Sequence, residues 1–184
     1  MQVSQLKRGA ISAALFAAAL TAGAAHAGTV TLDVAGIASN AGFGDASNET
    51  RYIDIFSNVR ITGISWSVSL ATEGSSWLSE MGVDLNTGAG GSGVSLFPGL
   101  GEDSSGTATY SGSADLVGLG LDFLLGADGR LNFEFFEFTD DFNGTDGTWA
   151  SGSLTVNYIP EPSSFGLAGL ALLGVGAVAR RRKS

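Results

Sequence analysis

The densest group of potential metal ligands in this chain lies in the acidic stretch at residues 140–147. Its side-chain oxygens belong to Asp140, Asp141, Asn143 and Asp146. Carboxylate and amide oxygens are the ligands that calcium prefers. The stretch departs from the EF-hand pattern, because Asp146 stands where a glycine is required and Gly152 where a glutamate is required. Two interpretations stay open: a calcium site, or a polar loop that turns between two strands.

A second chemistry needs only two carboxylates, which is the arrangement that hydrolyses glycosidic bonds. Seventeen acidic side chains lie between residues 28 and 159, so some pair has a suitable separation by chance. Glu134 and Glu137 are one such pair, but strand geometry places them on opposite faces. A glycosidase is therefore the third alternative for function, and the chain is expected not to be an enzyme.

The mature domain is expected to lack histidine and cysteine chemistry. The chain has no cysteine, and its single histidine, His26, lies at the end of the N-terminal targeting segment. Ser and Cys triads need a histidine or an equivalent base, and zinc or copper centres favour His and Cys ligands. Apart from the calcium alternative, no cofactor is expected.

Exposed aromatic side chains would allow contact with a carbohydrate. Trp77 and Trp149 both stand beside glycine and serine, in stretches expected to be loops. There an aromatic ring has less core to fill. Trp66, Phe133 and Phe135 are instead expected in the core, because they belong to alternating apolar runs. A carbohydrate-binding module that uses Trp77 and Trp149 is the second alternative for function.

Charge is segregated along the chain. Six of the nine basic residues lie near the two ends, and those between residues 28 and 159 are Arg51, Arg60 and Arg130. This middle part has a formal balance of −14, because it carries all the acids except Glu161. Such a surface repels phosphate backbones, so no nucleic-acid partner is expected.

The first 27 residues have the organisation of a secretory signal peptide. A positive region is followed by a short apolar stretch at residues 10–22. The small residues Ala25 and Ala27 fit the preference of signal peptidase, which places cleavage before Gly28. The mature domain is therefore expected to begin at Gly28 and to lie outside the cytoplasm.

Three features follow one another at the C-terminus: a Pro-Glu-Pro triplet, an apolar stretch at residues 165–179, and a basic cluster. The triplet is Pro160, Glu161 and Pro162, and the cluster is Arg180, Arg181, Arg182 and Lys183. As a helix the apolar stretch is about 22 Å long, slightly less than a hydrocarbon core of ~30 Å. The positive-inside rule keeps the basic cluster in the cytoplasm, which stops transfer and leaves the domain outside.

This combination resembles the PEP-CTERM sorting segment, also known as the "ice-binding protein C-terminal domain". The triplet fits the motif residue by residue, and the resemblance covers residues 160–183. It implies an inner-membrane intermediate and processing near the triplet by an exosortase, a membrane enzyme. It also implies a Gram-negative bacterium that makes exopolysaccharide, with the product at the cell surface or in the extracellular biofilm matrix.

The segment from residue 28 to residue 159 is predicted to be an all-β, antiparallel β-sandwich. Apolar and polar residues alternate in short runs at residues 29–34, 64–70, 81–85, 131–135 and 154–158. A change of phase at Gly63 predicts a β-bulge. Residues 116–123 are predicted as a short strand, and Asp128-Gly129 predicts a hairpin between Leu125 and Leu131. Seven to nine short strands separated by such turns are typical of a sandwich.

Two patches, residues 61–86 and 141–158, also resemble the jelly-roll domain attached to proprotein convertases and bacterial exoenzymes. The shared feature is a Gly-Thr-Trp sequence at residues 147–149 followed by Gly-Ser-Leu at residues 152–154. This resemblance implies a jelly-roll-like fold and no particular activity.

The chain is thus expected to have a signal peptide (1–27), an acidic β-sandwich (28–159) and a sorting segment with a transmembrane helix (160–184). The leading interpretation is a non-catalytic exported surface or extracellular-matrix protein, associated with exopolysaccharide or biofilm. The expected partners are signal peptidase, an exosortase-type enzyme, exopolysaccharide and, through the C-terminal helix, the membrane.

Overall fold

The computed structural model describes residues 27–88, 91–140 and 145–161. Residues Ala27–Pro160 form one compact unit, the sandwich domain. The predicted signal peptide up to residue 26, Pro162, the apolar stretch at 165–179 and the basic cluster lie outside the described residues. No helix within the described ranges is long and apolar enough to cross a membrane.

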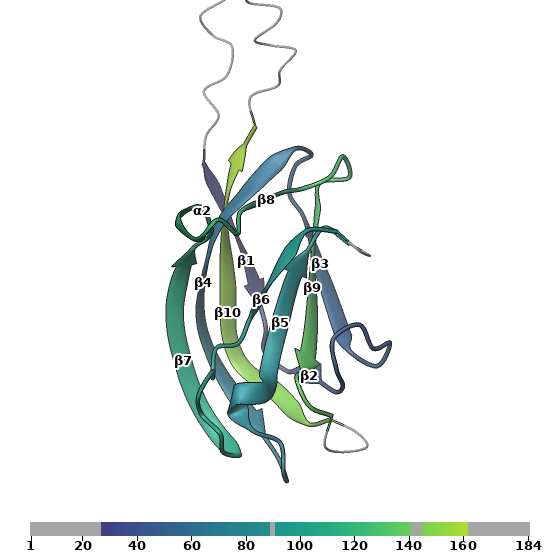
Figure 1. Ribbon diagram of the computed structural model, residues 1–184, viewed down its shortest axis with the longest axis vertical. Helices are drawn as coiled ribbons and strands as arrows, with labels where there is room; N and C mark the ends of the chain where they lie inside the picture. The colour runs from purple at the N-terminus through teal and green to yellow at the C-terminus, as the bar shows by residue number, and fades with distance from the viewer. Residues whose placement is uncertain (1–26, 89–90, 141–144, 162–184) are drawn as a thin grey trace, which may run out of the picture. The chain divides into compact units, whose positions relative to one another are not determined.

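Two antiparallel sheets make up the domain (Figure 1). The six-stranded sheet holds β1 (Gly28–Asp33), β2 (Ile37–Ser39), β4 (Val59–Thr72), β7 (Gly106–Asp115), β8 (Phe123–Leu124) and β10 (Gly147–Pro160). The four-stranded sheet holds β3 (Glu49–Asp54), β5 (Met81–Asn86), β6 (Gly93–Leu96) and β9 (Arg130–Glu137). Two short helices complete the described elements: η1 (Leu78–Glu80) and α2 (Leu116–Leu119). The predicted antiparallel sandwich is confirmed.

The order of the strands is that of a jelly roll. The main path of one sheet is β1-β10-β4-β7, and the other sheet is β3-β9-β5-β6. When the eight strands of these two paths are followed along the chain, they pass from sheet to sheet as in a double Greek key. As a result β10, the last strand, lies between the first strand and β4; it pairs with β4 along most of its length and with β1 over residues 153–158.

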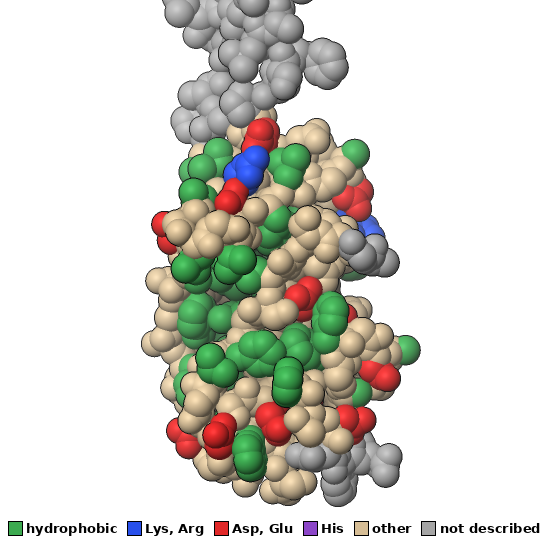
Figure 2. Space-filling model, viewed as in Figure 1, with side chains coloured by type: hydrophobic (Ala, Val, Ile, Leu, Met, Phe, Trp, Pro, Cys, Tyr) green, Lys and Arg blue, Asp and Glu red, His purple; other side chains and the backbone are tan. Residues whose placement is uncertain are grey.

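The domain has two distinct ends. At the exit end, β1 begins at Gly28 and β10 ends at Pro160, and these two strands pair with each other there (Figure 1). At the distal end, β10 begins at Gly147 beside the end of β4. On the face drawn in Figure 2, arginine side chains lie toward the exit end, whereas acidic side chains are also present around the distal end.

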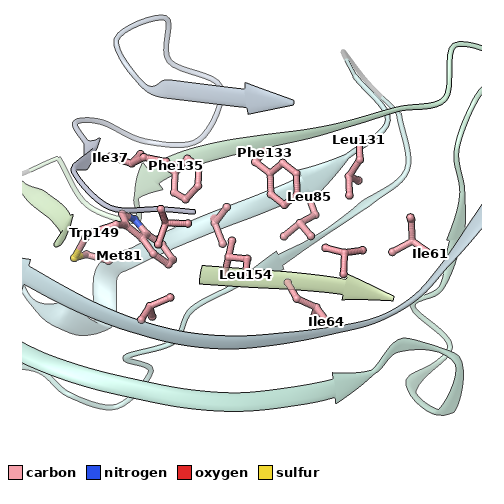
Figure 3. Close-up of a cluster of buried hydrophobic side chains, with 14 of the residues drawn as sticks. Ile37, Ile61, Ile64, Met81, Leu85, Leu131, Phe133, Phe135, Trp149 and Leu154 are labelled. Atoms are coloured by element: carbon pink, nitrogen blue, oxygen red, sulfur yellow. The ribbon is translucent and has the colours of Figure 1, made fainter. Parts of the chain in front are cut away.

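The core fills the space between the sheets. The predicted alternation is confirmed on β4, where Ile64, Val68 and Leu70 are buried. Phe133 and Phe135 of β9 approach from the other sheet and are fully buried (Figure 3). Trp66 faces the same core but is only partly buried. Burial of this set of apolar side chains is the main source of stability in a domain that has no disulfide.

The predicted bulge at Gly63 is also confirmed. Asn157 of β10 pairs with Gly63, but the next residue, Tyr158, pairs with Ile61, so Thr62 is the extra residue. The bulge changes which side chains point inward, so that both Ile61 and Ile64 are buried despite their odd spacing.

Two local predictions are wrong. Asp128 and Gly129 do form a turn, but β8 before it pairs with β4 and β9 after it pairs with β3 and β5, so no hairpin results. The predicted strand at residues 116–123 begins instead as α2. Asp115 caps this helix by accepting a hydrogen bond from the Val117 amide (3.1 Å), and Gly120 ends it at a positive φ of 71°.

Candidate functional site

The sorting triplet begins inside the last strand of the sandwich. Ile159 pairs with Arg60 and Pro160 with Val59, so the sheet extends to the first proline of the triplet. Proline has no backbone N–H and is tolerated at the end of a strand, where it limits further pairing. Glu161 follows outside the strand and is exposed. The chain therefore leaves the domain at the triplet itself, without a linker between the last strand and the motif.

The outer face of the six-stranded sheet carries rows of hydroxyl groups. Residues that pair directly across antiparallel strands point to the same face. The first row is Thr31, Thr155, Ser65 and Ser113; the second is Ser153, Ser67 and Ser111, with Asp33 at its edge; the third is Ser151, Ser69 and Thr109. These three rows are called the hydroxyl face.

The hydroxyl face is chemically uniform, and all of its side chains are short. Its only charged member is Asp33, in a domain whose formal balance is −14. Thr31 and Thr155 are joined by a hydrogen bond between their hydroxyl oxygens (3.0 Å). Neighbouring strands lie about 4.8 Å apart, so the rows present donors and acceptors at a regular spacing. Such a surface can exchange hydrogen bonds with water or with a polymer rich in hydroxyl groups.

Aromatic side chains gather near the distal end, on the outer face of the four-stranded sheet. Phe136 is nearly buried there and packs edge-on against Phe43 and Phe97, with ring centroids 5.5 Å apart in both pairs. Phe43 and Phe138 are exposed. Gly82 leaves room for this packing, because a Cβ atom there would lie 2.7 Å from the Phe136 ring. These ring pairs are T-shaped, so they do not form the coplanar platform that stacking on a sugar ring requires.

The two predicted carbohydrate contacts have different surroundings. Trp77 precedes η1 and is 45% exposed. Trp149 is fully buried, packs edge-on against Phe135 (5.1 Å between centroids) and donates a hydrogen bond from Nε1 to the Ser39 hydroxyl (3.2 Å). The expected role of Trp149 as a surface contact is therefore wrong, since it is a core residue of β10.

The predicted calcium stretch is described only in part. Asp141 and Asn143 lie outside the described residues. Asp140 is exposed, whereas Asp146 is almost completely buried and donates its backbone N–H to the Ser39 carbonyl (3.1 Å). Within the described ranges, no group of three or more acidic or imidazole side chains is arranged to hold a metal ion. The calcium site stays a prediction.

Glu134 and Glu137 lie on opposite faces of β9, as predicted. Glu137 is fully buried, and its carboxylate lies beside Gly147, where an added Cβ atom would be 2.7 Å from Oε1. Glu134 faces outward and accepts hydrogen bonds from the Gly44 amide (2.5 Å) and the Asn48 side chain (3.0 Å). The two carboxylates therefore do not face a common substrate.

Two side chains have shifted acidities with clear causes. The pKa of Asp45 is lowered because its carboxylate accepts hydrogen bonds from the Ser47 amide and hydroxyl. The pKa of Tyr110 is raised, first by burial and second by the nearby negative charge of Glu102. The Tyr110 hydroxyl is buried and makes no hydrogen bond with any described residue.

Comparison with known proteins bears directly on the end of β10. Residues 159–183 match the family model of the PEP-CTERM protein-sorting motif. The chain carries a PEP-CTERM sorting motif. This match indicates a bacterial protein that is exported and sorted to the cell surface through processing by an exosortase. A search of curated proteins found no match to the chain.

Several solved structures are similar to the sandwich domain. A serine protease of Aeromonas sobria has a TM-score of 0.42 and 14% identity, with 80% of this chain and 30% of that chain covered. The VP2 subviral particle of infectious bursal disease virus has a TM-score of 0.32 and 14% identity, with 72% and 33% covered. The extra small virus of the giant freshwater prawn Macrobrachium rosenbergii has a TM-score of 0.31 and 10% identity, with 77% and 82% covered. The chain spans about a third of the length of the first two structures.

Sequence reasoning missed the hydroxyl face and the burial of Glu137 and Asp146. The alternating serines at 65, 67 and 69 supply one member of each row, but the rows themselves depend on the pairing of four strands that are far apart in sequence. The burial of the two carboxylates depends on how the ends of β9 and β10 meet the segment around Ser39 and Ala41, and no local pattern signals it.

Proposed function

We propose that the sandwich is a non-catalytic module of a Gram-negative cell surface or biofilm matrix, where it associates with exopolysaccharide. The observation that carries the proposal is the PEP-CTERM match, which begins at the last residues of β10. Because the chain enters the motif directly from the last strand, processing near the triplet would release or transfer the whole folded domain. In this proposal, the sandwich is the part of the protein that is displayed at the cell surface or in the matrix.

A membrane-held intermediate is part of this proposal. Signal peptidase removes residues 1–27, and the apolar stretch at residues 165–179 then stops in the inner membrane. The four basic residues after it remain in the cytoplasm, which keeps the domain and the triplet on the outer side. The exosortase acts on the triplet in this state.

Two variants test the sorting step in different ways. Deletion of residues 165–184 removes the apolar stretch and the basic cluster, so the domain should appear free in the periplasm or medium. Replacement of Pro160, Glu161 and Pro162 by alanine keeps the apolar stretch, so the chain should accumulate uncleaved in the inner membrane. Cell fractionation with an antibody against the domain separates the two outcomes. Normal processing of the alanine variant would contradict recognition by an exosortase.

The hydroxyl face supports exopolysaccharide as the partner. It is uncharged over three rows except for Asp33, so it neither repels an acidic polysaccharide strongly nor requires a specific ion. Hydrogen bonds between hydroxyl groups are individually weak in water, since each replaces a bond to water, so affinity requires many contacts at once. A regular array on a rigid sheet meets this requirement.

Co-sedimentation with exopolysaccharide from the same cells tests the face. The surface-extracted protein should sediment with the polymer, and Ser67→Glu in the middle of the hydroxyl face should weaken this several-fold. Ser57→Glu adds the same charge in an exposed loop away from the face and should have little effect. Equal binding by both variants and the unaltered protein would remove the hydroxyl face as the contact surface.

A contact through Trp77 is the second candidate, and its partial exposure favours it. In the same assay, Trp77→Ala should abolish sedimentation if the tryptophan stacks on a sugar ring, and should leave it unchanged if the hydroxyl face is the contact. Release of reducing sugar from the polymer, lost in Glu134→Gln, would contradict the non-catalytic proposal and favour the glycosidase alternative.

A further inference from the structure

Aliphatic side chains are exposed together at the exit end of the sandwich. Four of them lie in the eight-residue stretch 117–124, which runs from α2 to the end of β8, and a fifth is on β10. They are Val117 (54% exposed), Leu119 (63%), Leu121 (48%), Leu124 (44%) and Ile159 (41%). Figure 2 shows hydrophobic side chains at the end of the domain that holds α2 in Figure 1. These five residues are called the aliphatic rim.

The register of the sheet joins the two parts of the rim. Arg60 of β4 pairs with Leu124 on one side and with Ile159 on the other. Directly paired residues point to the same face, so two aliphatic side chains flank the arginine on the outer face of the sheet. The guanidinium is held by Asp122, with Nη1 2.6 Å from Oδ2. The rim therefore surrounds one ion pair and gains little net charge from it.

The rest of this outer face has the opposite character. Away from the exit end it is the hydroxyl face, made of serine and threonine. On this face, the exposed leucine, isoleucine and valine side chains of the rim thus lie where the chain leaves the domain; Leu100, which is 81% exposed, lies between β6 and β7. Contiguous apolar surface rimmed by polar groups is typical of a surface that contacts another protein or a membrane.

The length of chain beyond β10 indicates that a membrane, and not another protein, covers the rim. Four residues, 161–164, separate Pro160 from the first residue of the apolar stretch. Five steps along an extended chain reach at most about 18 Å. The headgroup region on each side of a bilayer is about 5 to 8 Å thick. Whenever residues 165–179 span the membrane, the exit end therefore stays within reach of the lipid headgroups.

We propose that the aliphatic rim docks on the outer surface of the lipid bilayer that holds the C-terminal segment. This inference rests on the proposed membrane intermediate. Leu119, Leu121 and their neighbours enter the boundary between headgroups and acyl chains, as the apolar face of an interfacial helix does. Arg60 lies among them at the level of the phosphates, where a long basic side chain is favoured. Docking fixes the orientation of the domain and holds the triplet at the membrane surface.

The test uses the full chain in vesicles of phosphatidylcholine and phosphatidylglycerol that contain a nitroxide-labelled phosphatidylcholine. The chain has no cysteine, so one introduced cysteine takes one fluorophore. Leu119→Cys places it in the rim, and Phe138→Cys places it at an exposed apolar position near the distal end. Nitroxide should quench the label at residue 119 several-fold more than the label at residue 138. Equal quenching in chains that float with the vesicles overturns the docking.

The short connection to the membrane segment could bring the label near the nitroxide without docking. Variants that carry the label at residue 119 test this alternative. Changing Val117, Leu121 and Leu124 to serine should reduce the quenching to the level at residue 138, while flotation after an alkaline wash is retained. Phe43→Ser, which removes an exposed aromatic elsewhere, should leave the quenching unchanged. Strong quenching in the triple-serine variant overturns the inference. A chain that fails to float refutes the membrane intermediate itself and the docking with it.

Discussion

The two ends of the sandwich differ in how their acidic side chains pair with arginine. At the exit end, Arg60 pairs with Asp122 (2.6 Å) and Arg130 with Asp54 (3.2 Å). The remaining arginine of the domain, Arg51, pairs with Glu49 (2.6 Å). Exposed or half-exposed acids near the distal end include Glu73, Glu80, Glu102, Asp103 and Asp140. All three arginines thus pair with other acids, and these five carboxylates add negative charge near the distal end.

This difference fits what each end meets. An end that lies against a bilayer gains from neutral ion pairs and aliphatic side chains, because charge is costly to remove from water. An end that faces the matrix gains from uncompensated negative charge, which repels other copies of the protein and attracts cations. One sheet connects the two ends, so the orientation of the domain at the membrane decides which surface is displayed.

The largest effect separates two tryptophans near the distal end. Trp149→Ala should lower the free energy of unfolding by about 3 to 5 kcal/mol, because it leaves a cavity beside Phe135 and removes the bond to Ser39. Trp77→Ala should cost less than about 1 kcal/mol, since that ring is already 45% exposed. Urea unfolding of both variants measures the difference. Similar losses would mean that Trp77 contributes to the core.

A second comparison uses calcium to distinguish the two ends. If residues 140–147 bind the ion, calcium at about 100 times its Kd should stabilise the domain by about 2.7 kcal/mol, which raises the melting temperature. The double change Asp141→Asn with Asp146→Asn should abolish the rise. Asp128→Asn, an exposed acid at the exit end, should leave it intact. An unaltered melting temperature in the native chain would favour the polar-loop interpretation.

A third test concerns Tyr110, whose hydroxyl is buried without a hydrogen bond to any described residue. Tyr110→Phe should raise the free energy of unfolding at pH 7 by about 1 kcal/mol, because it removes an unsatisfied polar group.

The raised pKa of Tyr110 adds a pH dependence with a definite sign. The folded state holds the phenolic proton to a higher pH than the unfolded chain, whose value is near 10.0. The stability linked to this group is present below pH 10 and is lost as the pH rises through the folded pKa. Urea unfolding between pH 8 and pH 11 should show a smaller loss in Tyr110→Phe. A steeper loss in the variant would contradict the assignment.

Much of the fold could be predicted because period-2 alternation reports directly on which side chains face a core. Ile64, Val68 and Leu70 are buried as predicted, and the phase change at Gly63 is the bulge. Trp149 was mispredicted because small residues on both sides suggested a loop. Those residues belong to β10, which β2 and β4 cover from two sides. Local composition does not contain that information.

The candidate surfaces could be predicted less well than the fold, because they depend on register. The short helix α2 has a local signal in Asp115 and Gly120, but four residues are too few to stand out in an alternating sequence. The row Leu124–Arg60–Ile159 joins three segments separated by more than thirty residues along the chain. Only the pairing of β4 with both β8 and β10 brings these side chains onto one face.

The smallest effect tests whether the exit end depends on its neutral ion pair. Asp122→Asn removes a carboxylate that pairs with Arg60, and both side chains are partly exposed, so the loss of stability should be about 0.2 to 1 kcal/mol. High salt should reduce this loss, because it screens the attraction in the native pair.

The same variant should associate more strongly with vesicles that contain anionic lipid, although its domain is less stable. The variant removes one negative charge beside Arg60 among the aliphatic side chains, which favours contact with phosphates. Quenching at residue 119 should therefore increase with the fraction of phosphatidylglycerol in Asp122→Asn more than in the native chain. A decrease would mean that Asp122 positions the rim through the local structure of α2 and β8, and not through charge.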